Sequence, residues 1–525
     1  MKTQIVLIAL LFFMFSLFAQ EQGKISIIPQ PNEIVVNYGF FELNTETVVV
    51  ADSTLKCSAR QLTRYLEPAT SFNLRIYLNG MTKTLVEDNF IRLQLEEDLD
   101  RYGEEGYFLE VTENHITISA SGQKGIFYGI QTLRQLMPKQ IFRKAEVNDI
   151  SWQIPCVQIE DNPRFSWRGL MIDYSRTFFN KRVTMHMIDI LSLYKMNVLH
   201  MHLTDDQGWR LEIRKYPELT ETASKFHESY DEPPEREGYF TQEDIREIII
   251  YASERNVVIV PEIEMPGHSA EVFSVFPELS CTGETYKIHP FFKGPGIHEE
   301  VLCVGNNNTL DFTKNVLSEV CDLFPSEYIH VGGDEAPKTH WKECPKCQQR
   351  MKDEGLKDEF ELQSWFIKEM EKHLNSKGKF MIGWNEILEG GLAPNAAIMF
   401  WHGDLDHTIK ATEKGHPVVM SPTSHCYFDY TYEKIPLEKV YEFDPVPVGL
   451  EKKFHDKILG CQANFWSHID RTVPKMNRQI FPRLIALSEV GWTENDKKDW
   501  QDFSERLESN LEVLNLLDVY YMETE

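Results

Sequence analysis

Short apolar runs alternate with helical segments through most of the chain after about residue 160. Eight such runs occur, and each ends in polar or aromatic residues. Amphipathic spacing predicts helices between them, for example over 184–196 and over 241–256, where Thr241 and Asp244 form a variant of the capping box. Alternating strands and helices indicate a parallel sheet, and eight repeats predict a closed (β/α)8 TIM barrel of the α/β class. The runs are RGLMIDYS (168–175), VLHMHLTDD (198–206), VVIVPEIE (257–264), YIHVGGDE (328–335), FMIGWNE (380–386), AAIMFWHG (396–403), PVVMSPTS (417–424) and ILGCQANFW (458–466).

The region before the barrel has a different pattern. VVVAD, FIRLQL, YFLEVT and HITISA alternate with period two and predict strands, and GIFYGIQTLRQLM predicts one amphipathic helix. A chain of 525 residues is long enough for two or three domains. We therefore expect a smaller α+β domain over 21–160 and the barrel over 161–525, with the final helix DWQDFSERLESNLEVLNLL packed against the barrel.

The first 20 residues have the pattern of a secretory signal peptide. Lys2 is followed by an apolar run from residue 5 to residue 18 and then by Ala19, where cleavage is expected. The run is too short for a comfortable transmembrane helix. The sequence thus predicts that 1–20 is removed and that the mature protein is exported without inserting into the membrane.

Composition narrows the classes of partner. With 42% hydrophobic and 26% charged residues the chain is typical of globular proteins. A formal net charge of −27 disfavours nucleic acids and anionic membrane surfaces, because both require basic patches. The acidity itself selects no substrate.

Asp334 and Glu335 stand side by side after an apolar run and two glycines, in HVGGDE. In a regular strand their side chains would point to opposite faces. Gly332 and Gly333 permit unusual backbone angles, so both carboxylates can face one cavity at the strand end, where TIM barrels carry their chemistry. Adjacent carboxylates are more often solvated surface, but this setting favours a pair in which the pKa of one acid is raised.

The ends of the other runs carry carboxylates and indoles. A sugar has apolar faces that lie on indole rings and hydroxyls that bind carboxylates, and glycoside hydrolysis generally needs two acidic groups. These strand ends therefore favour a carbohydrate site over packed core. They are Asp173, Asp205, Glu262, Trp384, Trp401 and Trp466.

Several motifs in order resemble glycoside hydrolase family 20, the β-N-acetylhexosaminidases, between residue 27 and Trp492. They are WRGLMIDYSR, LHMHLTDDQGWR, PEIEMPGH, HVGGDE, GWNE and PRLIALSEVGW. The resemblance implies an exo-acting, retaining hydrolase that removes terminal β-linked N-acetylhexosamine from glycans without a cofactor. The 2-acetamido oxygen of the substrate would attack the anomeric carbon and form an oxazolinium ion. The alternatives are a disaccharide-releasing lacto-N-biosidase, an enzyme specific for 6-substituted GlcNAc, and a non-catalytic sugar-binding protein. The sequence does not distinguish a monomer from a homodimer.

The resemblance also implies roles for five residues. Glu335 would be the general acid and then the base that activates water. Asp334 would hold the acetamido N–H, and Tyr427 would bind the acetamido carbonyl oxygen. His268, paired with Asp205, would orient Glu335 and tune its pKa.

The remaining site residues follow from the same resemblance as sugar contacts. Arg168 would bind the 3- and 4-hydroxyls and Asp429 the 6-hydroxyl. The acetamido methyl and the sugar face would be enclosed by Trp384, Trp401 and Trp466.

One position departs from the family. After Trp466 and Ser467 the chain has His468, where relatives usually have a glutamate that binds near the 4-hydroxyl. A histidine can donate a hydrogen bond where a carboxylate only accepts. We expect the change to alter preference at the 4- or 6-position of the sugar.

Two patterns raise the question of a metal. Cys344 and Cys347 form a CPKC pair that fits half a zinc site, a redox pair or a local disulfide, and no second closely spaced pair accompanies it. A disulfide or two unpaired thiols is the favoured interpretation. His200 and His202 would share one face of a strand, but packed core is the more common role for such a run. We expect no metal at either place.

Overall fold

The computed structural model describes residues 25–79, 87–226, 228–230, 232–233, 236–288, 296–468 and 471–523. The predicted signal peptide, 1–20, lies outside these residues. The chain divides into two compact units, one made of Met1–Pro163 and Asp496–Val519 and the other of Arg164–Asn495 and Tyr520–Glu525. Among the described residues, no helix combines the length and apolarity needed to cross a bilayer.

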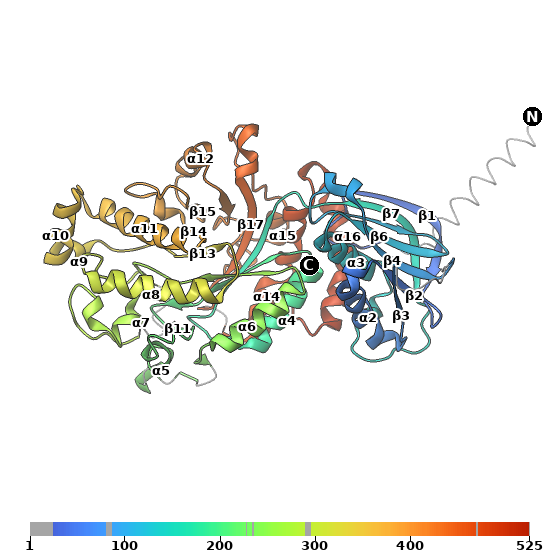
Figure 1. Ribbon diagram of the computed structural model, residues 1–525, viewed down its shortest axis with the longest axis horizontal. Helices are drawn as coiled ribbons and strands as arrows, with labels where there is room; N and C mark the ends of the chain where they lie inside the picture. Colours follow the sequence, from blue (N-terminus) through green and yellow to red (C-terminus); the bar gives the residue numbers. More distant parts are fainter. Residues whose placement is uncertain are drawn as a thin grey trace, which may run out of the picture. The chain divides into compact units, whose positions relative to one another are not determined.

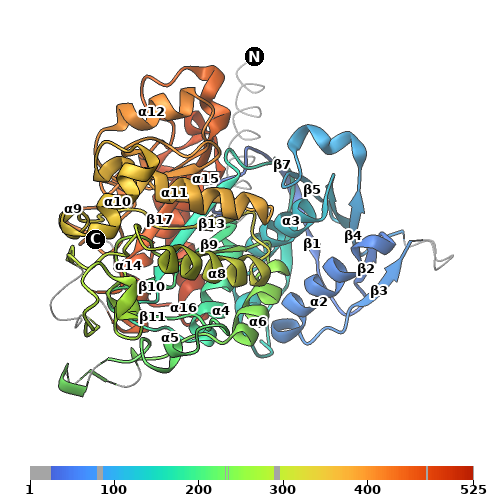
Figure 2. The ribbon, with the colours of Figure 1, turned by 60° about the vertical axis from the view of Figure 1, so that its left-hand side comes forward.

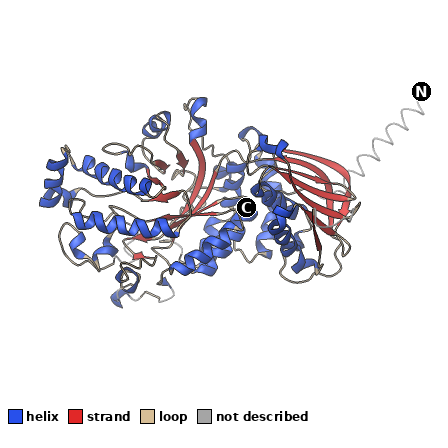
Figure 3. Ribbon diagram, viewed as in Figure 1, coloured by secondary structure: helices blue, strands red, loops and turns tan. Residues whose placement is uncertain are grey.

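The first unit is a seven-stranded mixed sheet with two long helices on one face (Figure 3). The strands and the helix that the alternation predicted are all present, so the α+β expectation is confirmed. Strands β1, β3 and β7 and helix α2 were not predicted. The elements are β1 (Glu33–Glu42), β2 (Val48–Ala51), α2 (Lys56–Thr70), β3 (Arg75–Leu78), β4 (Phe90–Leu95), β5 (Tyr107–Val111), β6 (His115–Ala120), α3 (Gln123–Leu136) and β7 (Gln153–Asp161), in the sheet order β1-β7-β5-β6-β4-β2-β3.

Helix α16 (Trp500–Leu516) belongs to this first unit, which corrects the expectation that it packs on the barrel. The Arg506 guanidinium donates to the carbonyl of Ile27 at 2.8 Å, and the Asn510 amide donates to the carbonyl of Ser26 at 2.8 Å. An amphipathic helix shows that one face is buried but not against which neighbour.

The second unit is a closed barrel of eight parallel strands surrounded by helices (Figures 1 and 2). All eight predicted strands are present, in the cyclic order β8-β9-β12-β13-β14-β15-β16-β17, and the TIM barrel is confirmed. The strands are β8 (Trp167–Asp173), β9 (Val198–His202), β12 (Val258–Glu262), β13 (Tyr328–His330), β14 (Phe380–Trp384), β15 (Ala397–Phe400), β16 (Val418–Met420) and β17 (Ile458–Phe465).

The helices cover the barrel from outside. Helix α6 begins at the predicted capping box, in which the side chains and backbone amides of Thr241 and Asp244 bond each other reciprocally. The helices are α4 (Lys181–Leu193), α5 (Glu218–Glu221), α6 (Gln242–Ser253), α7 (Ala270–Phe273), α8 (Asn307–Leu323), α9 (Thr339–Glu343), α10 (Pro345–Glu354), α11 (Glu359–Ser376), α12 (Leu405–Glu413), α13 (Leu437–Tyr441), α14 (Val473–Ile480) and α15 (Arg483–Trp492). A two-stranded hairpin, β10 (Thr204–Asp205) and β11 (Gly208–Trp209), follows β9 at the carboxyl end.

The barrel interior is a packed core rather than a channel. Side chains from six of the eight strands, β8, β9, β12, β14, β15 and β16, meet there and fill the interior. The buried cluster consists of Trp167, Val198, Val260, Ile382, Trp384, Ala397, Met399 and Val419.

Candidate active site

The residues after β13 turn sharply so that Asp334 and Glu335 lie on the same side of the strand end. Gly332 and Gly333 have φ of +64° and +92°, and Glu335 has φ of +42°. A Cβ on Gly332 would lie 1.6 Å from a carboxylate oxygen of Glu264, so only glycine fits there. The glycines thus release the two acids from the alternation of a strand.

His268 is the point where the two acids converge. Its Nε2 atom lies 3.6 Å from Glu335 Oε2 and 3.9 Å from Asp334 Oδ2. On the other side of the ring, Nδ1 lies 3.3 Å from Asp205 Oδ1 and 3.1 Å from Asp206 Oδ2. The structure therefore brings together His268, Asp205, Asp334 and Glu335, with Asp206 as a further partner of the ring.

Electrostatics make His268 a cation. Burial opposes its charge, but Asp205 and the other carboxylates raise the pKa of His268 well above its ordinary value. Burial would also raise the pKa of Asp205, yet the charges of Arg176 and His268 hold it well below its usual range. A protonated His268 donates to an acid and holds it in place.

Asp334 and Glu335 differ in environment. Asp334 is 8% exposed and burial raises its pKa to about 8, although the charge of His268 acts in the opposite direction. The Glu335 side chain is 31% exposed. Adjacent carboxylates with such different burial can perform different tasks in one reaction.

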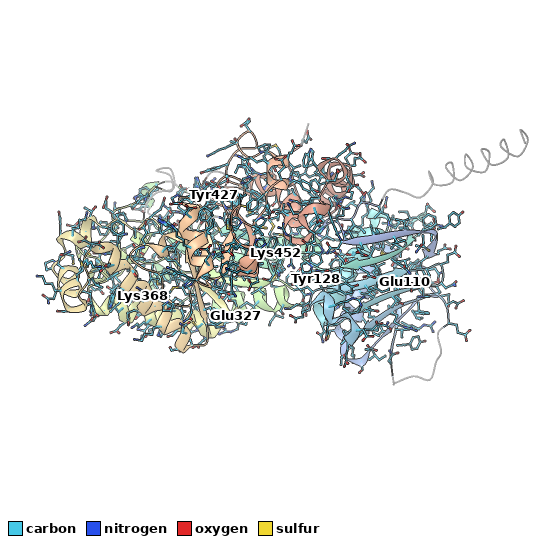
Figure 4. All side chains as sticks on the ribbon, turned by 90° about the horizontal axis from the view of Figure 1, so that it is seen from above. Glu110, Tyr128, Glu327, Lys368, Tyr427 and Lys452 are labelled. Atoms are coloured by element: carbon cyan, nitrogen blue, oxygen red, sulfur yellow. The ribbon has the colours of Figure 1, made fainter. Side chains whose placement is uncertain are left out.

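Aromatic rings lie beside the acids at the carboxyl end of the barrel, which we call the mouth. Trp384 and Trp401 have centroids 6.5 Å apart, and Trp384 and Trp466 have centroids 6.0 Å apart. Tyr427 stacks on Trp401 with centroids 5.9 Å apart and lies 6.3 Å from Trp466. In Figure 4, Tyr427 and Glu327, the residue before β13, lie toward opposite edges of the barrel unit.

The buried carboxylate of Glu262 positions Trp384, one of these aromatic residues. One carboxylate oxygen accepts the Trp384 indole N–H at 2.8 Å, and the other lies 2.5 Å from His202 Nδ1 and 3.1 Å from His200 Nε2. Burial would raise the pKa of Glu262, but His330 and the two other imidazoles hold it well below its usual range. The paired histidines of β9 are thus partners of a buried carboxylate that positions an indole.

The loop after β16 is tied to β17 and to α15. Tyr427 pairs with Asn464 as a parallel bridge, and the Arg483 guanidinium donates to the carbonyls of Phe428 and Tyr430 at 2.6 and 2.9 Å. Arg483 was not identified from the sequence. It holds the carbonyls on both sides of Asp429.

Arg168 is not in the site, which corrects its predicted role. It is the second residue of β8, at the amino end of the barrel, and its guanidinium donates to the carbonyls of Lys195 and Phe165 at 2.7 and 2.6 Å. Arg176, three residues after β8 ends at Asp173, is the arginine at the mouth. Its guanidinium pairs with Asp205 at 2.6 Å and lies 5.1 Å from the centroid of the Trp466 ring.

We expect the two arginines to respond differently to substitution. Arg176→Lys removes the planar guanidinium between Asp205 and the Trp466 ring and should lower kcat/KM about 10- to 100-fold, the size of one or two charge-assisted bonds. The matched variant Arg168→Lys should lower Tm and leave kcat/KM nearly unchanged. Steady-state kinetics and thermal unfolding measure both, and a larger kinetic loss in Arg168→Lys would contradict the correction.

Several polar atoms of the mouth are buried without a hydrogen-bond partner within the described residues. Among them are Asp334 Oδ1, Asp429 Oδ1 and His468 Nδ1. Buried polar atoms normally have partners, so unpaired ones mark places for ligand groups. Burial raises the pKa of Asp429 to about 7 and lowers that of His468 to about 4, so His468 is neutral at pH 7 and can donate from one nitrogen and accept at the other.

Paired acids, a buried imidazolium and a group of indoles at the carboxyl end of a TIM barrel define a glycoside hydrolase. Comparison with known families supports the class. The model of glycosyl hydrolase family 20, catalytic domain, matches 165–495, and the model of family 20, domain 2, matches 24–162. The chain belongs to glycosyl hydrolase family 20.

Individual relatives agree with this assignment. A β-hexosaminidase of Porphyromonas gingivalis is 39% identical over 510 residues, which cover 95% of this chain and 64% of the relative, so the chain spans about two-thirds of that protein's length. A mutant Streptomyces plicatus β-hexosaminidase in complex with the product GlcNAc aligns with a TM-score of 0.83 at 27% identity, covering 95% and 97% of the two chains. A β-N-acetylhexosaminidase from Bacteroides fragilis aligns with a TM-score of 0.81 at 30% identity, covering 95% and 97%.

Proposed function

We propose that this protein is an exo-acting, retaining β-N-acetylhexosaminidase that uses substrate-assisted catalysis. One observation carries the mechanism: Asp334 and Glu335 meet on the same imidazole, within 3.9 and 3.6 Å of His268 Nε2. In most retaining glycosidases the acid and the nucleophile flank the scissile bond from opposite sides. Here both carboxylates lie on one side, beside the same imidazole. This arrangement fits a mechanism in which one of them is the general acid, the other positions the substrate, and the sugar itself supplies the nucleophile.

The first step breaks the glycosidic bond. Glu335 gives its proton to the leaving oxygen while the acetamido oxygen of the substrate bonds to the anomeric carbon, which yields an oxazolinium ion and a free alcohol. Asp334 accepts the acetamido N–H and stabilises the positive charge that spreads over the ring. Burial raises the pKa of Tyr427 well above its ordinary value, so its neutral hydroxyl can donate to the acetamido oxygen.

The second step restores the enzyme. Glu335, now a carboxylate, takes a proton from water, and the hydroxyl attacks the anomeric carbon as the oxazolinium ring opens. The two displacements leave the β configuration in the product. His268 acts on Glu335 by position and charge and does not react with the sugar.

The experiment that tests this function compares aryl β-glycosides of GlcNAc with aryl glycosides of a GlcNAc-containing disaccharide. We expect release of the aryl group from the monosaccharide and little or none from the disaccharide. Preferential cleavage of the disaccharide would indicate a lacto-N-biosidase. Binding of GlcNAc without release from either would indicate a sugar-binding protein.

His468 is expected to set preference at the 4- or 6-position. His468→Glu replaces a neutral ring, whose buried Nδ1 has no hydrogen-bond partner among the residues that the structure describes, with a carboxylate that can only accept. We expect the ratio of kcat/KM between GlcNAc, GalNAc and 6-sulfated GlcNAc substrates to shift by about tenfold, the size of one changed hydrogen bond, with the sulfated sugar losing most. Unchanged ratios would remove the assignment.

We propose further that the mature enzyme is exported and acts as a monomer or homodimer on glycans that carry terminal N-acetylhexosamine. The signal-peptide pattern of 1–20 supports export. Fractionation of the producing cells should find activity outside the cytoplasm with Lys2 absent from the mature N-terminus, and light scattering gives the oligomeric state. Activity retained in the cytoplasm with an intact N-terminus would contradict export.

A further inference from the structure

Four cysteines from two distant segments meet beside the active-site loops. Cys281 and Cys303 lie in the connection between β12 and α8, while Cys344 and Cys347 lie at the start of α10, after β13. Their sulfur atoms all lie within 4.8 Å of one another. Cys303, Cys344 and Cys347 are buried, and Cys281 is half-buried.

The sulfur separations match a tetrahedral metal site. The Cys303–Cys344, Cys303–Cys347 and Cys281–Cys347 sulfurs are 3.6, 3.7 and 3.8 Å apart. In a Zn²⁺ site with four bonds of about 2.3 Å, the tetrahedral arrangement separates the sulfurs by about 3.8 Å. A disulfide would place two of them about 2.05 Å apart.

The surrounding backbone is built to bring the two segments together. A Cβ on Gly305 would lie 2.4 Å from the Cys347 amide nitrogen and from the carbonyl of Lys346, so glycine lets the segment after Cys303 rest on the CPKC turn. The Trp341 indole donates to the carbonyl of Leu302 at 2.9 Å. Helix α10 begins at Pro345, within the CPKC pair. The free backbone amides of the first turn of this helix favour negatively charged ligands.

The chemistry of four neighbouring thiols suits a divalent metal. Such an ion binds thiolates and displaces their protons, so a single metal can be shared by all four sulfur atoms.

We propose that Cys281, Cys303, Cys344 and Cys347 bind a structural Zn²⁺. Four thiolates in a tetrahedron select Zn²⁺ or iron among common metals, and a closed site of four protein ligands is typical of structural zinc. Binding exchanges thiol protons for the metal and requires no oxidant or reductant. The sequence disfavoured this site because Cys281 and Cys303 are neither adjacent to each other nor near the CPKC pair in the chain.

The position of the metal gives it a role in the active site. It joins the β12–α8 connection, which carries His268, to the segment after β13, which carries Asp334 and Glu335. The amide of Leu302, next to Cys303, donates to the carbonyl of Pro266 at 2.9 Å and so links the cysteine to the turn that carries His268. The zinc site would therefore hold the imidazole at its distance from the acids.

Metal and thiol analysis of the full-chain protein, purified without chelators or a histidine tag, tests the proposal. We expect about one zinc per chain by elemental analysis and nine reactive thiols after denaturation in chelator, one for each cysteine of the chain. Two disulfides would consume four of the nine and leave five, with no metal. That result, iron in place of zinc, or nine thiols without metal would each overturn the proposal.

Variants provide a second test that does not depend on enzyme activity. Cys303→Ser and Cys347→Ser should lose the zinc and several degrees of Tm, whereas Cys321→Ala, a buried cysteine of α8 outside the cluster, should retain the metal. If the serine variants do not fold, cobalt replaces zinc in the unaltered chain. Strong sulfur-to-cobalt charge-transfer absorption in the near ultraviolet is then expected, and its absence contradicts thiolate ligation.

Discussion

Glu335→Gln is expected to lower kcat/KM at least about 10²-fold on substrates with a sugar leaving group, because general acid catalysis contributes at least that factor. Glutamine keeps the size of the side chain and its approach to His268, 3.6 Å in the native enzyme, but cannot transfer a proton. The loss should lie mainly in kcat, since the amide still fits the ground-state complex. Steady-state kinetics on chitobiose-type and aryl substrates measure it.

Comparing substrates with different leaving groups distinguishes loss of the general acid from a general disruption of the active site. An aryl leaving group of low pKa departs without protonation, so Glu335→Gln should retain much more of its activity on such a substrate than on an oligosaccharide. Glu327→Gln serves as the matched control, because Glu327 lies directly before β13, at the amino end of the strand (Figure 4). This variant should leave both rates unchanged. Near-normal activity of Glu335→Gln on oligosaccharides would contradict its role.

The strands of the barrel were predictable because each is a short run bounded by turns and helices. Buried strands of a parallel sheet read as continuous apolar segments, and the polar residue that ends each run marks the carboxyl end. The capping box at Thr241 was predictable for a similar reason, since it depends on residues three apart. Features that depend on residues close together in the sequence, such as these strands and this helix cap, could therefore be predicted from it.

The incorrect assignment of Arg168 shows that the sequence does not give the exact positions at which a strand begins and ends. Arg168 and Arg176 stand eight positions apart in one motif, and both have the residue type that binds sugar hydroxyls. Only the extent of β8, Trp167–Asp173, shows that Arg168 is near the start of the strand and that Arg176 follows its end. In a parallel barrel that difference moves a side chain from the amino end of the barrel to the carboxyl end.

The four cysteines could not be grouped from the sequence for a different reason. Long connections carry Cys281 and Cys303 around the barrel mouth to the CPKC turn, and neither spacing nor periodicity reports such a meeting. The same limit applies to α16, whose apolar face fits either unit. Contacts between segments distant in the chain depend on the packing of the whole fold rather than on local pattern.

Asp334→Asn is expected to lower kcat/KM about 10²- to 10³-fold, the range found when a single preorganised electrostatic contact to a transition state is removed. A carboxylate accepts the acetamido N–H and stabilises the positive oxazolinium ion, whereas the neutral amide of asparagine does neither as well. This residue does not protonate the leaving group, so the loss should persist on aryl substrates of low leaving-group pKa. The two neighbouring acids should thus differ in their dependence on the leaving group, and identical dependence in both variants would contradict the division of roles.

The pKa of Asp334 gives this prediction a second measurement. Burial raises the pKa to about 8 in the free enzyme, so the carboxyl is largely protonated at pH 7. An acetamido N–H that donates to Asp334 favours the carboxylate and lowers this pKa, which means that binding of GlcNAc at pH 7 should release up to about one proton. Calorimetry in buffers with different ionisation enthalpies counts that proton, and Asp334→Asn should abolish its release. Proton release of equal size in the variant would assign the titration to another group and remove Asp334 from contact with the amide.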